Sequence, residues 1–166
     1  ATYTPDPSEA GTVVTLTLTS DAGTGCPSVS DQINITIDQL ATVNAGPSIN
    51  TCIDGVANLN GIVGGGAIGG IWTGGVGAFT PSNTSLNVIY TPAMSEVNST
   101  VTLTLTAIMD IGNVCPVPFD QLDLIIEDVP SANAGIDQSV CFGGSVSLNG
   151  SLGGGAVTAT WSSSGD

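Results

Sequence analysis

Apolar and polar residues alternate with a period of two along much of the chain. Between residues 100 and 106, Val101, Leu103 and Leu105 occupy the odd positions and threonines occupy the even ones. The run 33–38 alternates isoleucine with Asn, Thr and Asp in the same way. Because successive side chains of a β-strand point to opposite faces, this pattern indicates strands with one buried face. No stretch shows the 3.6-residue period of an amphipathic helix.

Turn-forming residues interrupt the alternation at short intervals. The chain contains 23 glycines and 9 prolines, and these divide its middle part into six predicted strands. Six or seven short strands in about 90 residues are typical of an antiparallel β-sandwich, so we expect an all-β fold without helices longer than two turns. The predicted strands span residues 48–52, 56–61, 69–74, 86–91, 100–108 and 120–127.

The sequence repeats itself at an interval of 89 residues. An Asn-Ala-Gly tripeptide, a cysteine, a run of three glycines and a tryptophan all return at this spacing. Residues 44–46 return at 133–135, Cys52 returns as Cys141, residues 64–66 return at 153–155, and Trp72 returns as Trp161. Self-similarity at a fixed period is the signature of tandem repeats that stack end to end.

The first part of the chain matches its later middle. Two motifs return 87 residues later: Tyr-Thr-Pro at 3–5 and Val-Thr-Leu-Thr-Leu-Thr at 14–19. Cys26 returns as Cys115 after 89 residues. We therefore predict three parts. Residues 1–43 are the C-terminal half of a first repeat, 44–132 a complete repeat, and 133–166 the N-terminal part of a third. The connections around 44–47 and 129–131 are too short to be flexible linkers, so successive repeats are expected to sit end to end.

The charge balance excludes several classes of partner. The chain has 14 acidic residues and no lysine, arginine or histidine, for a formal net charge of −14. Nucleic acids and anionic membrane surfaces are bound largely through Lys and Arg, so neither is expected as a partner. No apolar run approaches the roughly 20 residues of a membrane-spanning helix, so no membrane insertion is expected in this segment.

The same missing residues argue against catalysis and against bound cofactors. Without histidine, lysine or arginine the chain can build neither a Ser-His-Asp nor a Cys-His site. The glycine runs at 64–66 and 153–155 lack the lysine of a phosphate-binding loop. Zinc is disfavoured because the cysteines show no CxxC spacing, and no calcium-loop pattern is present. We predict that the protein is not an enzyme and has no catalytic, cofactor-binding or metal residues, and we interpret acids such as Asp110, Asp120 and Asp123 as solvated surface groups.

The two tryptophans have two possible roles. Trp72 and Trp161 each follow a glycine-rich turn at the same place in their repeat. An exposed indole there could stack on a sugar ring, whereas a buried one would fill the core between two sheets. One tryptophan per repeat at a fixed position favours the core.

The four cysteines occupy two positions per repeat, which suggests disulfides and therefore an oxidising, extracellular setting. The leading prediction pairs Cys52 with Cys115 inside the complete repeat, and gives Cys26 and Cys141 partners in repeats outside this segment. If the two positions lie at opposite poles, they exceed the roughly 7 Å between Cα atoms that a bridge allows. Each cysteine would then bond to a neighbouring repeat. Pairing Cys26 with Cys52 across the junction is disfavoured, because a strand, a linker and another strand separate them.

The order of these motifs resembles the tandem immunoglobulin-like, PKD-like repeats of giant secreted adhesins of the Bacteroidota, including gliding-motility adhesins. The residues that carry the resemblance are the Asn-Ala-Gly, Leu-Asn-Gly and glycine-run motifs, the tryptophan, Tyr-Thr-Pro, Val-Thr-Leu-Thr-Leu-Thr and Asp-Gln. The resemblance implies immunoglobulin-like sandwich repeats of about 89 residues, export to the cell surface, and a role in extending or displaying something. It transfers no ligand site.

Two functions fit these observations. The first is a structural repeat segment of an extended extracellular fibre or stalk in a large cell-surface adhesin, whose partners are the neighbouring repeats of the same chain. The alternative is an adhesive binding module that contacts polysaccharide or another cell. A concave polar pocket or an exposed aromatic cluster would favour binding. Surfaces covered uniformly by Thr, Ser and Asn would favour the stalk.

Overall fold

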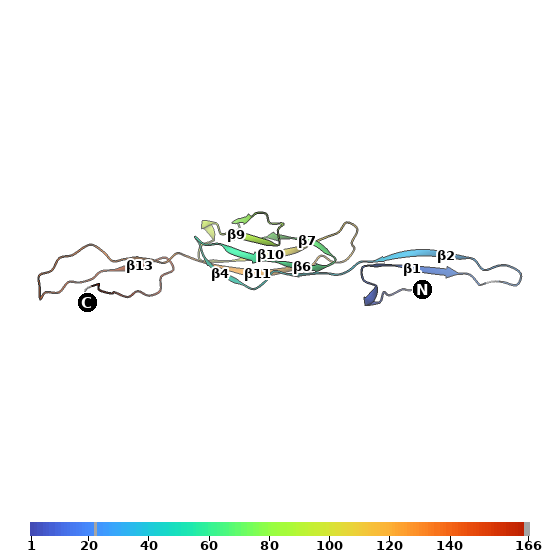
Figure 1. Ribbon diagram of the computed structural model, residues 1–166, viewed down its shortest axis with the longest axis horizontal. Coiled ribbons are helices and arrows are strands. Elements are labelled where there is room, and N and C mark those ends of the chain that lie inside the picture. Colours follow the sequence, from blue (N-terminus) through green and yellow to red (C-terminus); the bar gives the residue numbers. More distant parts are fainter. Residues whose placement is uncertain (22, 165–166) are drawn as a thin grey trace.

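The computed structural model describes residues 1–21 and 23–164, and the chain runs along one long axis with a packed domain between two thinner segments (Figure 1). The N-terminal segment is a hairpin of β1 (Thr12–Thr19) and β2 (Ser30–Ile37). The C-terminal segment contains β12 (Ser131–Asn133) and β13 (Ser151–Gly153), which pair with each other. Helix within the described residues is limited to the three-residue 3₁₀ turns η1 (Pro7–Glu9) and η2 (Met94–Glu96). The predicted all-β fold is confirmed.

The central domain is a sandwich built mainly from two sheets. Its larger sheet has the strand order β4–β11–β10–β7, its smaller sheet has the order β5–β9–β8, and β3 pairs with β6 beside them. These strands are β3 (Ala41–Asn44), β4 (Ile49–Cys52), β5 (Ala57–Asn60), β6 (Ile62–Gly65), β7 (Ala67–Thr73), β8 (Ala78–Thr80), β9 (Asn87–Thr91), β10 (Ser99–Met109) and β11 (Phe119–Glu127).

All six predicted strands are present, with ends within two residues of the prediction. The prediction missed β3, β6 and β8. β6 reads Ile-Val-Gly-Gly and β8 has three residues, so neither is long enough to show alternation. The pairing of β4 with β11 is parallel, whereas the other strand pairs are antiparallel as expected.

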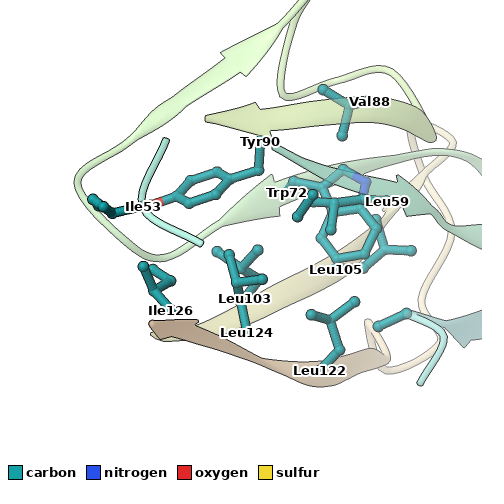
Figure 2. Close-up of a cluster of buried hydrophobic side chains, with 12 residues drawn as sticks. Ile53, Leu59, Trp72, Val88, Tyr90, Leu103, Leu105, Leu122, Leu124 and Ile126 are labelled. Atoms are coloured by element: carbon teal, nitrogen blue, oxygen red, sulfur yellow. The ribbon is translucent and has the colours of Figure 1, made fainter. Parts of the chain in front are cut away.

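The core lies between the two sheets, and Figure 2 shows the side chains that meet there. Leu103 and Leu105 of β10 are fully buried, while the alternating Thr102, Thr104 and Thr106 are exposed or half-buried. Each such leucine stabilises the fold by about 1.5–3 kcal/mol relative to an exposed one. The core residues of the larger sheet are Trp72, Leu103, Leu105, Leu122, Leu124 and Ile126, and those of the smaller sheet are Ala57, Leu59, Val88 and Tyr90.

Candidate functional site

The connection between the N-terminal hairpin and the central sandwich is held by close backbone contacts. The Gly66 N–H donates to the Leu40 carbonyl oxygen over 3.2 Å. Gly65 has a φ of 63°, and a Cβ built on it would collide with that same oxygen. A Cβ on Gly66 would collide with the carbonyl of Gln39. Glycine is therefore required at both positions, because the backbone of the preceding linker leaves no room for a side chain.

The second junction repeats the first. Gly154 has a φ of 58°, and a Cβ there would collide with the Val129 carbonyl, as at Gly65. β12 and β13 pair as β3 and β6 do. The Asn133 side chain accepts a hydrogen bond from the Gly135 N–H over 2.7 Å, and Asn44 accepts one from Gly46 over 2.8 Å. The Asn-Ala-Gly and triple-glycine motifs thus build the same connection twice.

The loop between β10 and β11 packs against the first junction. The Asp38 carboxylate accepts a hydrogen bond from the Val114 N–H over 2.8 Å. The Asp120 carboxylate accepts one from the Ala45 N–H, also over 2.8 Å, and this bond holds the pKa of Asp120 below its usual value. The interpretation of Asp120 as a solvated surface acid is wrong, because this half-buried side chain ties β11 to the start of the sandwich.

The structure does not bring Cys52 and Cys115 together. In the part of the chain that the structure describes, all four thiols are free. Cys52 lies level with Glu127, the last residue of β11, whereas Cys115 precedes the first residue of that strand. A nine-residue strand spans about 26 Å, far more than a disulfide bridges. The predicted Cys52–Cys115 bridge inside one repeat is therefore wrong. The partners of Cys26 and Cys141 stay a prediction.

A buried cluster of polar groups lies near the other end of the sandwich. The Tyr90 hydroxyl donates to the Glu96 carboxylate, with oxygen–oxygen distances of 2.8 and 3.0 Å. That carboxylate also accepts the N–H groups of Val76 and Ala93, each over 2.8 Å. The Gly77 N–H donates to the Tyr90 oxygen over 2.8 Å. Every polar atom of the pair is thus satisfied although only 6% of Glu96 is exposed.

The cluster shifts the pKa of both acids. Burial, followed by the hydrogen bond to Glu96, raises the pKa of Tyr90 to about 12. Burial alone would also raise the pKa of Glu96. The hydrogen bonds from the Val76 and Ala93 N–H groups and from Tyr90 outweigh it and lower that pKa below the ordinary value. The folded chain therefore favours the ionised form of Glu96.

Sequence reasoning missed this cluster, although a signal was present. A Ser-Glu pair follows Tyr-Thr-Pro in both repeats, so Glu9 stands to Tyr3 as Glu96 stands to Tyr90. The Tyr3 hydroxyl donates to Glu9 over 2.6 Å, and the Asp6 N–H donates to the same carboxylate over 2.7 Å. A glutamate retained six residues after a tyrosine, in a chain with 8% charged residues, could have been recognised as structural.

Trp72 lies in the core as expected, whereas Trp161 is more than half exposed and does not. Trp72 is 0% exposed, and its ring nitrogen donates to the Leu86 carbonyl over 3.2 Å. A sugar cannot stack on it. Trp161 is 57% exposed, and its ring lies over Gly150 as the ring of Trp72 lies over Gly61. The indole therefore occupies the same position in both repeats.

No group of three or more Cys, Asp or Glu side chains among the described residues is arranged to hold a metal ion. The same residues include no helix that is long and apolar enough to cross a membrane. No model of a known protein family matches the sequence, and a search of curated proteins finds no significantly similar one.

Proposed function

We propose that this chain is a structural repeat segment of an extended extracellular fibre or stalk belonging to a large cell-surface adhesin. The observation that carries the proposal is the recurrence of one junction at two places along a drawn-out chain (Figure 1). Because the same backbone contacts form at Gly65 and at Gly154, each added repeat should continue in a similar direction.

The charge of the chain supports a spacer. The net charge of −14, with no cation to pair with, would keep neighbouring fibres apart and soluble.

The test is length against repeat number. One, two and four extra copies of residues 44–132 are inserted after residue 132, and the maximum dimension is measured by small-angle scattering. A stalk requires that dimension to rise linearly with the number of copies. Compact particles, whose dimension levels off, would contradict the proposal. Tight binding of the chain to a defined glycan would favour the adhesive alternative.

A matched pair of glycine variants tests whether the junction sets the shape. Gly154 and Gly143 both have positive φ, at 58° and 82°, but only a Cβ on Gly154 meets the preceding linker. Gly154→Ala should bend or loosen the second junction and change the maximum dimension, whereas Gly143→Ala should leave it unchanged. Equal scattering curves for both variants would show that the glycine contact does not direct the chain.

A further inference from the structure

We propose that the cysteine equivalent to Cys52 in one repeat forms a disulfide with the cysteine equivalent to Cys115 in the next repeat. Successive repeats would then be joined by a covalent bridge as well as by the peptide chain. The inference rests on the proposed function in one respect, because it requires repeats that follow one another in a single chain.

Cys52 is the last residue of β4 and lies at the C-terminal end of the sandwich. In the parallel pair of β4 and β11, Cys52 lies level with Glu127. The next residue, Ile53, donates its N–H to the Glu127 carbonyl oxygen over 2.8 Å. Cys52 is exposed and follows the half-buried Thr51, so its side chain is on the outer face of the strand. Cys52 therefore lies beside Glu127 in the neighbouring strand, where the repeat ends.

Cys115 lies at the opposite pole of the sandwich. Its thiol donates to the Asp38 carbonyl oxygen over 3.7 Å, and the neighbouring Val114 N–H holds the Asp38 carboxylate. Asp38 directly follows β2, the last strand before the junction. Cys115 is thus placed against the end of the preceding repeat.

The repeat relates the two ends to each other. Asp38 and Glu127 are 89 residues apart, the interval of the repeat, so they are the same position in successive repeats. The residue at this position pairs with the Cys52-type cysteine of its own repeat, as Glu127 does, and its carbonyl is contacted by the Cys115-type thiol of the following repeat, as that of Asp38 is. The junction that follows Glu127 has the same glycine contacts as the one that follows Asp38. A junction flanked by two complete repeats would therefore bring the two cysteine types to the same residue position.

The chemistry needs an external oxidant. A thiolate of one cysteine attacks a small disulfide or the disulfide of an oxidoreductase, and one thiol leaves. The second cysteine thiolate then displaces the other half from this mixed disulfide. The two protein thiols lose two protons and two electrons, and the external disulfide takes them up as two thiols. Cys52 is exposed and Cys115 half-buried, so both sulfurs are reachable.

The test extends the full chain at its C-terminus with a second copy of residues 78–132. Residue 166 aligns with residue 77, so the extension completes the third repeat and adds a second Cys115-type cysteine. The extended chain is oxidised with glutathione disulfide and digested with chymotrypsin, because trypsin has no lysine or arginine to cleave. Mass spectrometry should find Cys52 linked to the added cysteine. Reduction should lower the urea midpoint of the extended chain and leave that of the original chain unchanged.

Two variants control the assignment. Cys52→Ser should abolish the link, whereas Cys26→Ser, which removes a cysteine of the other type from the first repeat, should leave it intact. A link from Cys52 to Cys115 of its own repeat would overturn the inference. So would a free Cys52 in an extended chain that shows a β-sheet circular dichroism spectrum and a cooperative urea transition. If maximum dimension still rises linearly with repeat number without a link, only this inference fails and the proposed function stands.

Discussion

The hairpin β1–β2 and the pair β10–β11 carry the same pattern and the same pairing in two different surroundings. Leu16 pairs with Ile33 in the hairpin, and Leu103 pairs with Leu122 in the sandwich. These residues correspond through the repeat, and the registers agree along eight pairs in each case. Strand pairing is thus determined by the alternation and by the connection within the hairpin.

Burial differs at the same positions. Leu18 of the hairpin is 79% exposed, whereas the equivalent Leu105 is 0% exposed. Leu105 lies beside Trp72 of β7 in its own sheet and faces the buried Leu59 of β5 in the other sheet (Figure 2). The hairpin has no such sheet opposite it among the described residues. The comparison teaches that these strands pair locally, whereas their leucines are buried only where a second sheet covers them.

The largest expected effect is at the two equivalent leucines. Leu105→Ala should lower the free energy of unfolding of the sandwich by about 2–5 kcal/mol, because it leaves a cavity in the core. Leu18→Ala should change it by no more than about 0.5 kcal/mol, because the side chain is already exposed. Urea unfolding followed by tryptophan fluorescence measures both. Similar losses would show that the hairpin is packed as tightly as the sandwich.

The next effect concerns the two glutamates. Glu96→Gln should destabilise the sandwich by about 1–3 kcal/mol, because an amide cannot accept all the hydrogen bonds that converge on the buried carboxylate. Glu9→Gln should have less effect on the same transition, because Glu9 belongs to the hairpin segment. The comparison uses urea midpoints at neutral pH. A larger effect at Glu9 would contradict the assignment of the main transition to the sandwich.

The smallest effect is a change of stability with pH. The pKa of Tyr90 is about 12 in the folded chain and 10.0 ordinarily, so the folded state keeps a proton that the unfolded state loses between these values. Stability should fall as pH rises through that window. The contribution of Glu96 to stability changes with pH in the opposite direction. Its lowered pKa means that its contribution is present above the ordinary value of 4.5 and is lost as pH falls through the folded pKa.

Phenylalanine variants separate the two tyrosines. Tyr90→Phe should flatten the alkaline fall in the urea midpoint of the sandwich. Tyr3→Phe should leave that fall in place, although the pKa of Tyr3 is also raised to about 12 by its bond to Glu9. If the urea midpoint of the Tyr90 variant still falls at alkaline pH as in the original chain, another group causes the loss of stability.

The sequence was informative wherever a feature is local. Alternation located β10 and β11, and the fixed position of Trp72 indicated the core. The parallel neighbour of β11 could not be predicted, because β4 lies some 75 residues earlier and no short turn fixes the register. The Cys52–Cys115 prediction failed for the same reason. Equal spacing in successive repeats says that two cysteines belong to one unit, but not at which pole each lies.

The pairing of β4 with β11 has a mechanical consequence. β4 follows the short strand β3 after one junction, and β11 is the last strand before the next. The two are side by side and parallel over Ile49–Cys52 and Leu124–Glu127. Tension applied to the two ends of the chain would pull them in opposite directions along their length. The hydrogen bonds of the pair are then loaded together in shear. In a hairpin that is pulled open from one end, by contrast, they break one after another. A repeat closed in this way should yield only at high force, and its resistance would depend on its rate of unfolding more than on its equilibrium stability.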